Sequence, residues 1–144
     1  MTQEEFISSI KSSGAFFAPA TDERDISLVN AGLQQLRAAV LPMFIIELYK
    51  TVGGIILGDA YIFGPKEISA ARKFPVPNIV QINNDISGLP QMRGKTVFGR
   101  NDLFWFAFDA FGTCFMLDNL TLKTLRTYDD PWRALIDCLA VGKL

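Results

Sequence analysis

The sequence contains no histidine and only two cysteines among its 144 residues. The absence of imidazole excludes the commonest general base, all metal sites that include histidine and the nucleophile triads that depend on it. Cys114 and Cys138 are far apart in the chain and have no further sulfur or imidazole partner, so they do not make up a zinc set. We therefore expect a protein that is not an enzyme and that has no catalytic residues, no cofactor and no metal ion.

Three features of the sequence favour the cytoplasm as the location of the protein. Cys114 and Cys138 both lie in apolar surroundings, as buried and unreactive thiols of a reducing compartment do. Met1–Glu5 shows no basic stretch followed by an apolar one, which a secretory signal would need. The longest apolar tract, Leu103–Leu117, contains Asp109 and is shorter than the roughly 18 residues of a membrane span. We expect a cytoplasmic protein without membrane insertion.

Charge is scarce and balanced. Fourteen basic and fifteen acidic residues give a formal net charge of -1, so the sequence lacks the basic excess of a nucleic-acid-binding protein. Hydrophobic residues make up 49% of the chain and charged residues 20%, which is typical of a folded domain and not of a disordered segment. The length suits one domain, with a helix and linker over residues 1–20 and a core over residues 25–142.

Helix starts are marked by capping residues. Thr2 is followed by Glu5 in the pattern of a capping box, and apolar residues recur at steps of three and four beyond Asp25. Proline suits the first position of a helix and glycine its end. The expected helices are Glu4–Ser12, one from about Asp25, one from Pro42 that stops at Gly53-Gly54, and one capped by Asp130 with Pro131 first that Gly142 closes.

After Gly54 the pattern changes to short β-prone runs separated by turn residues. A short helix over Pro65–Arg72 and a long surface loop over Asn83–Gly94 interrupt them. The expected strands are Ile55–Leu57, Ala60–Phe63, Asn78–Ile82, Thr96–Phe98, Phe104–Phe108, Cys114–Leu117 and Leu122–Tyr128.

This order of elements predicts an α+β fold rather than alternating parallel units. We expect a largely antiparallel sheet of about five to seven strands, packed on one face by the N-terminal helices and the C-terminal helix. The alternation of Phe104, Phe106 and Phe108 provides an apolar side for those helices. The other face of the sheet is then left partly free. Trp105 either covers this outer face or packs beneath a helix, and it would be a binding anchor if it is exposed.

Three local patterns suggest chemistry, and each has a simpler interpretation. Gly94-Lys95-Thr96 resembles the end of a phosphate-binding loop, but Leu89 stands where that loop needs a glycine. Residues 83–88 have the oxygen spacing that opens a calcium loop, although the twelfth position is Gly94 and not a glutamate. Asp109 and Asp118 would be the pair for a small carboxylate enzyme, but each stands where a strand meets a turn. Turn structure is the favoured interpretation of all three.

Short motifs follow one another in a particular order between Asp25 and Gly142. They are Leu41-Pro42 with Leu48-Tyr49 and Gly53-Gly54, then Phe63–Ile68, then Phe98–Arg100, then Phe108-Asp109 with Gly112, and then Phe115–Asp118. In order and spacing the chain resembles the SUKH superfamily, which includes Smi/Knr-type cell-wall regulators, the SecY-interacting protein Syd and many bacterial immunity proteins. Thr113 departs from the acidic residue that many members carry after this glycine, which puts a polar interaction at that turn in doubt.

The resemblance implies a single SUKH-like domain, 1–144, that acts by binding a protein. The leading hypothesis is an immunity protein that neutralises a bacterial competition toxin by occluding its effector domain, and the chain's pI of about 5.4 would not repel a basic toxin. The alternative is a regulatory or scaffold protein of the Smi/Knr or Syd type with an endogenous cellular partner. We expect a monomer or weak homodimer. Charged residues near strand ends and loops are the candidate contacts, together with the tryptophan: Asp59, Lys66, Glu67, Asp85, Arg93, Arg100, Asp102 and Trp105.

Overall fold

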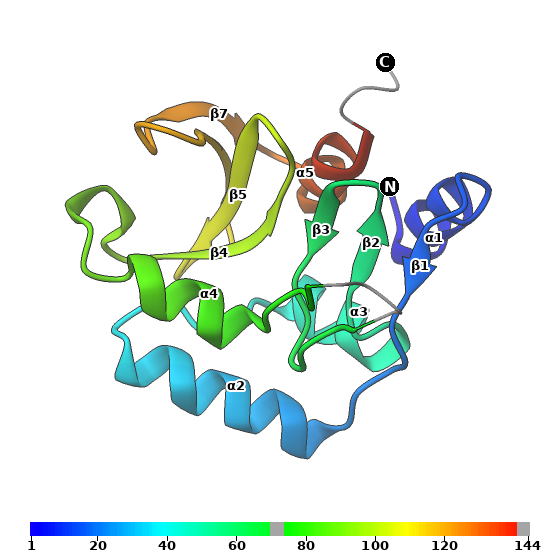
Figure 1. The fold of residues 1–144 in the computed structure, drawn as a ribbon, viewed down its shortest axis with the longest axis horizontal. Helices are drawn as coiled ribbons and strands as arrows, with labels where there is room; N and C mark the ends of the chain where they lie inside the picture. Colours follow the sequence, from blue (N-terminus) through cyan, green and yellow to red (C-terminus); the bar gives the residue numbers. More distant parts are fainter. Residues whose placement is uncertain (70–73, 141–144) are drawn as a thin grey trace.

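The computed structural model describes residues 1–69 and 74–140. Within these ranges seven strands form one sheet whose order follows the chain, and all neighbours are antiparallel. The predicted α+β class is confirmed (Figure 1). The helices are α1 (Gln3–Lys11), α2 (Glu23–Gln35), α3 (Met43–Thr51), α4 (Ile79–Ile86) and α5 (Pro131–Ala140), with a 3₁₀ turn η1 (Pro90–Met92). The strands are β1 (Phe16–Phe17), β2 (Ile55–Leu57), β3 (Ala60–Ile62), β4 (Lys95–Arg100), β5 (Phe104–Asp109), β6 (Cys114–Asp118) and β7 (Thr124–Tyr128).

Side-chain caps begin the helices close to where the sequence predicts them. The Thr2 hydroxyl accepts a hydrogen bond from the Glu5 amide at the start of α1. The Asp130 carboxylate accepts one from the Trp132 amide at 3.0 Å at the start of α5. Pro42 caps α3 from the position before its first residue, and α2 begins earlier than predicted, because Asp22 is its cap. The predicted stop of α5 at Gly142 lies outside the described residues.

The predicted strand Asn78–Ile82 is wrong, because these residues begin helix α4. The Asn78 side chain accepts from the Gln81 amide and the Gln81 side chain accepts from the Asn78 amide, both at 2.8 Å. This reciprocal cap outweighs the weak β preference of the Ile79-Val80 pair. The loop predicted over Asn83–Gly94 is wrong for the same reason, since its first turn continues α4 and η1 follows. Phe16–Phe17, where the sequence predicts no strand, forms the edge strand β1 and pairs with β2.

The short helix predicted over Pro65–Arg72 is also wrong where the structure describes it. Ile68 forms an antiparallel β-bridge with Val76, with mutual backbone hydrogen bonds of 2.9 and 3.0 Å. Pro65 and the residues up to Ser69 therefore form a connection that bends at Pro65 and Lys66 and is not a helix. The rest of the predicted helix lies outside the described residues.

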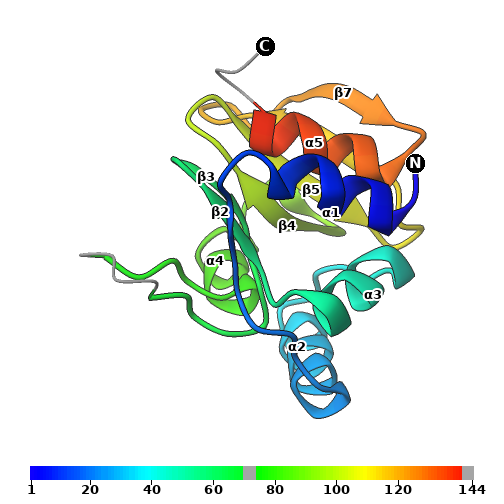
Figure 2. The same cartoon turned by 90° about the vertical axis from the view of Figure 1, so that its right-hand side faces the viewer.

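A chain of aromatic rings joins the sheet to its helices on one side. Phe108 stacks on Phe98 at 5.9 Å between ring centroids, and Phe98 meets the edge of Phe44 in α3 at 6.1 Å. Phe44 in turn contacts Trp132 of α5 at 5.9 Å, and Trp132 contacts Phe6 of α1 at 5.6 Å. Figure 2 shows α5 and α1 in front of β4 and β5, on this side of the sheet. α1, α3 and α5 thus lie on one face of the sheet, as predicted, whereas α2 packs on α3 and α4.

Candidate protein-binding surface

The sheet has a second face that points away from α5. A Cβ atom added at Gly99 would lie 3.1 Å from the Cys138 sulfur, so the side of β4 that carries Gly99 faces α5. The next residue, Arg100, points to the opposite side. Arg100 is in register with Tyr61 of β3 and Trp105 of β5. Residues directly opposite in neighbouring strands share a face, so these three side chains form a row on the face without α5.

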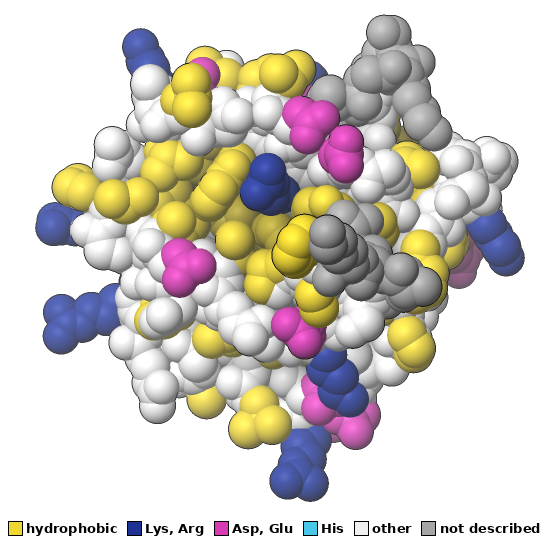
Figure 3. Space-filling model, in the orientation of Figure 1, with side chains coloured by type: hydrophobic (Ala, Val, Ile, Leu, Met, Phe, Trp, Pro, Cys, Tyr) yellow, Lys and Arg dark blue, Asp and Glu magenta, His cyan; other side chains and the backbone are white. Residues whose placement is uncertain are grey.

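Basic side chains lie over aromatic rings on this face. The Arg100 guanidinium carbon is 6.0 Å from the centroid of the Trp105 ring, and the Lys95 ammonium is 5.1 Å from that of Phe115. Phe115 shares the face because it is in register with Ala107, two residues after Trp105. We call Tyr61, Lys95, Arg100, Trp105 and Phe115 the outer face. Figure 3 shows hydrophobic side chains gathered in a hollow here, with a basic side chain across it.

The guanidinium group of Arg100 has a hydrogen-bond donor that is not used in the folded chain. Its Nε atom is buried and has no hydrogen-bond partner, and neither Arg100 nor Lys95 belongs to an ion pair within residues 1–69 and 74–140. A buried donor without an acceptor costs about 1–3 kcal/mol. A carboxylate that reaches this Nε would remove the cost, and a second carboxylate would be needed to pair with Lys95 at the other end of β4.

Four of the eight predicted contact residues lie at one end of the sheet. Because β3 and β4 are antiparallel, the β2–β3 turn with Asp59 lies beside the β4–β5 turn with Asp102. Arg100 and Trp105 flank the second of these turns. Asp59 and Asp102 are both exposed, so the outer face ends in an acidic edge.

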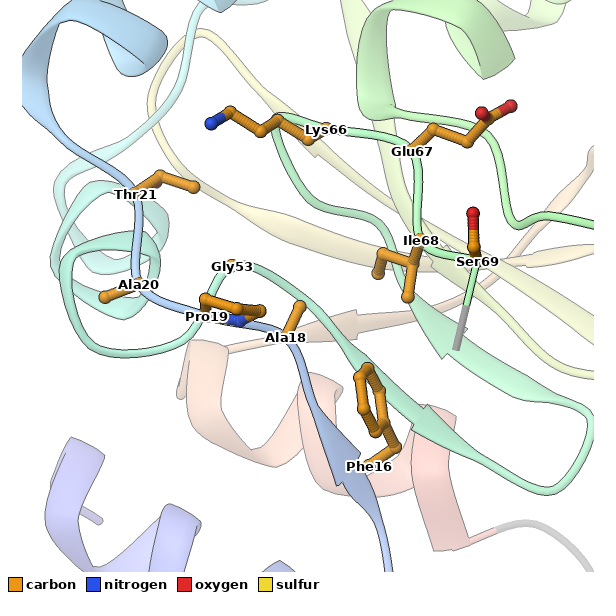
Figure 4. Close-up of a pocket in the computed structure, with 10 residues that line it drawn as sticks. All are labelled: Phe16, Ala18, Pro19, Ala20, Thr21, Gly53, Lys66, Glu67, Ile68 and Ser69. Atoms are coloured by element: carbon orange, nitrogen blue, oxygen red, sulfur yellow. The ribbon is translucent and has the colours of Figure 1, made fainter. Parts of the chain in front are cut away.

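Lys66 and Glu67 lie elsewhere, on a cavity of about 290 Å³. Figure 4 shows their side chains extending in different directions at its rim, with Ala18 and Ile68 lining it between them. The Lys66 ammonium is 3.4 Å from a carboxylate oxygen of Asp25, so an internal ion pair already uses its charge. These two residues are separate from the outer face.

The last two predicted residues lie around the other end of β4. Asp85 is exposed on α4. Arg93 lines a second cavity of about 270 Å³, together with Arg37 and with Lys95 of the outer face. The eight residues therefore form three groups and not one continuous site, because Arg93 approaches the outer face only through Lys95.

The two cysteines show no sign of reactive chemistry. Burial raises the pKa of the Cys114 thiol to about 12, and the nearby Asp109 and Asp130 carboxylates add to that shift. Burial also raises the pKa of the Cys138 thiol well above its ordinary value. Both thiols are free and buried, so neither is a ready nucleophile at neutral pH.

Asp109 and Asp118 serve their own turns. Asp109 accepts from the amides of Phe111 and Thr113 at 2.9 and 3.0 Å. Backbone hydrogen bonds, first from Thr121, hold the pKa of Asp118 below its ordinary value. Asp118 is in register with Phe104, at the opposite end of β5 from Asp109, which separates the two by about 16 Å at 3.3 Å per residue. Catalytic carboxylate pairs lie within about 10 Å of each other.

Sequence reasoning missed Tyr61, Lys95 and Phe115. For Trp105 the sequence left two positions open, on the outer face or beneath a helix, and the structure places it on the outer face, opposite the phenylalanines that face the helices. Phe115 follows from the same alternation once the turn after Asp109 sets the register of the hairpin. For Tyr61 and Lys95 the sequence holds no comparable signal, because their positions depend on how β4 pairs with β3 and with β5.

A scan of the sequence against protein-family models found no match, and a search among curated proteins found none. In the described ranges no cluster of three or more His, Cys, Asp or Glu side chains is arranged to hold a metal ion. None of the helices described is both long and apolar enough to cross a bilayer.

Proposed function

We propose that the chain is a protein-binding domain of the immunity type, whose outer face docks on the effector domain of a bacterial competition toxin and occludes it. The observation that carries the proposal is the half-buried Trp105 with Arg100 over its ring, on a sheet face that α5 does not cover. Tryptophan, tyrosine and arginine are the residues most enriched among those that dominate binding energies. The resemblance to the SUKH superfamily supports the toxin as the partner.

The charges of the outer face specify the partner's surface. Arg100 has an unpaired Nε, and Lys95 stands at the other end of β4. The toxin surface that fits should therefore present apolar side chains with carboxylates beside them. The acidic edge at Asp59 and Asp102 favours a basic side chain at the rim of the same contact. The complex forms in the cytoplasm, between one toxin domain and one copy of this chain.

Co-expression with the toxin encoded beside its gene tests the proposal. The wild-type chain should restore growth, and Trp105→Ala and Arg100→Gln should abolish this protection. With purified components each change should weaken the complex on the order of 30-fold or more, the effect of losing a residue worth about 2 kcal/mol.

Matched controls are available on helices away from the outer face. Leu28 is 63% exposed on α2, and Lys11 is exposed on α1, which lies on the covered side of the sheet (Figure 2). Leu28→Ala and Lys11→Gln should protect as well as the wild type. Absence of protection by the wild-type chain, or full protection by both outer-face variants, would show the proposal to be wrong.

A further inference from the structure

Three basic residues line the second cavity, which lies between the end of α2 and the segment from α4 to β4. Leu36, Arg37 and Ala38 form one side of it. Ser87 to Pro90 and Met92 to Arg93 form the other side, and Lys95 completes the lining. No acidic residue lines the cavity. Figure 1 shows the ends of α2 and α4 side by side, and the two helices are in contact.

The positive charge of this cavity is not neutralised internally. Arg37, Arg93 and Lys95 take part in none of the ion pairs in the described part of the chain. The C-termini of α2 and α4 oppose them, each with about half a negative charge. Asp85, exposed on α4, and Asp109, directly opposite Lys95 in β5, add negative charge without lining the cavity. The three formal positive charges lie in the lining itself, whereas both carboxylates lie outside it, so the cavity remains electropositive.

The end of α2 places Arg37 at the cavity. The Arg37 amide donates to the Gln34 carbonyl and the Ala38 amide to the Leu33 carbonyl, both at 3.0 Å, which is the Schellman arrangement of a helix end. This arrangement gives Arg37 a φ of 57°, in the left-handed region where helices usually place glycine, at a conformational cost that glycine avoids. The helix end accounts for this conformation, and it sets Arg37 beside Arg93 and Lys95 in the lining of the cavity.

We propose that this cavity binds a small, multiply charged phosphate compound of about the size of pyrophosphate. Guanidinium groups hold phosphate oxygens through paired N–H donors, and Lys95 adds a point charge. The volume of about 270 Å³ lies at the lower limit for ligand pockets, which suits a phosphate group and excludes a nucleotide base beside it. Lys95 belongs both to this cavity and to the outer face, so the variants that test the cavity change only Arg37 and Arg93, which are not part of the outer face.

Titration of the full chain with pyrophosphate by calorimetry, at a constant ionic strength of about 0.1 M, tests this site. Saturable binding is expected. Arg93→Gln and Arg37→Gly should each weaken it about tenfold or more, because each removes charge-assisted hydrogen bonds. Arg37→Gly is the sharpest variant, because glycine relieves the backbone strain and should raise Tm while affinity falls. A loss of fold therefore cannot imitate the expected result.

Arg24→Gln is the matched control, since Arg24 is an exposed cation on the first turn of α2, far from the cavity in the helix. It removes the same formal charge and should leave pyrophosphate affinity unchanged. Equal affinities in all three variants would assign binding to net charge and overturn the proposal, as would absence of saturable binding. Tighter binding of a phosphoserine-containing peptide than of pyrophosphate would contradict a free phosphate compound as the ligand.

Discussion

The side-chain amide of Asn83 hydrogen bonds to both backbone groups of Val97, each at 2.8 Å. β3 pairs with β4 only at Gly99 and Arg100, so Val97 lies beyond the end of β3. Asn83 takes the place of the missing strand, and its amide also donates to the Ile79 carbonyl at 2.8 Å. One buried amide thereby attaches α4 to the open edge of the sheet.

Asn83→Leu should lower the free energy of unfolding by about 2–5 kcal/mol, because it leaves the buried N–H and C=O of Val97 without partners. Urea denaturation followed by circular dichroism measures the change. Asn84→Leu alters the exposed neighbour on the same helix and should change stability by less than about 0.5 kcal/mol. Similar values for the two variants would contradict the role assigned to Asn83.

Gly64→Ala should prevent stable folding. A Cβ atom at Gly64 would overlap the carbonyl oxygen of Gly53, where the backbone of the two segments is in direct contact. The backbone cannot yield as a flexible side chain would, so we expect a loss of more than about 4 kcal/mol. A Cβ atom at Gly88 meets nothing within 4 Å, and Gly88→Ala should keep the wild-type thermal transition. Soluble expression and calorimetry of both variants give the comparison.

Phe98→Ala should cost about 3–5 kcal/mol, since Phe98 is fully buried in the middle of the ring chain between Phe108 and Phe44. Phe98→Leu should cost less, because it keeps most of the buried volume. Phe111 is 93% exposed at the tip of the β5–β6 turn, and Phe111→Ala should be nearly neutral. The denaturant midpoint should fall most for Phe98→Ala, less for Phe98→Leu and hardly at all for Phe111→Ala. Any other order of the three midpoints would contradict a central place of the ring chain in the core.

Acrylamide quenching distinguishes the two tryptophans. Trp105 is half-buried on the outer face, whereas Trp132 is 8% exposed beneath α1 and α3. The Trp132→Phe variant, which retains only Trp105, should therefore be quenched more strongly than the Trp105→Phe variant. Equal quenching would mean that the outer face is covered in solution.

The buried thiols predict the response to alkali. Because burial raises the folded-state pKa of Cys114 to about 12, the unfolded thiol ionises first as pH rises above its ordinary value near 9. The contribution of each buried thiol to the free energy of unfolding is fully present below that pH. It falls between about pH 9 and 12, by at most about 1.4 kcal/mol per pH unit for each thiol. Cys114→Ala should make this decline shallower in urea titrations.

The same burial gives a reactivity test. At pH 8 an aromatic disulfide reagent should label neither Cys114 nor Cys138 in the folded chain and both after denaturation. Rapid labelling of either thiol in the native protein would contradict the burial described here.

The elements that the sequence predicted correctly have strong local signals. Thr2 and Asp130 mark helix starts that form where the caps indicate, and the alternating phenylalanines of β5 predict a strand with one covered side. The strand prediction over Asn78–Ile82 is wrong because it follows the β preference of Ile79 and Val80. The reciprocal cap of Asn78 and Gln81, which the sequence also contains, is the stronger local signal. Phe16–Phe17 was missed because two residues are too few for any periodicity to appear.

For the candidate site the sequence was informative only in part. Trp105 and Arg100 were both among the eight predicted contacts, but the sequence left open whether Trp105 faces outward or packs beneath a helix. The sequence did not show that Lys66 and Glu67 lie away from the outer face, because the order of the strands in the sheet decides which turns are neighbours. Arg37 has no local signal for a pocket, since the cavity forms only where α2 and α4 come together.

By itself the sequence determined the α+β class, most element positions and the covered side of β5, because caps and side-chain alternation act over a few residues. The tertiary structure alone decided that Asn83 completes the edge of β4, that Arg100 lies over Trp105, and that Arg37, Arg93 and Lys95 line one cavity. Each of these relations joins residues from different helices, strands or turns. They depend on strand pairing and helix packing, which the free energy of the whole fold selects and no short segment encodes.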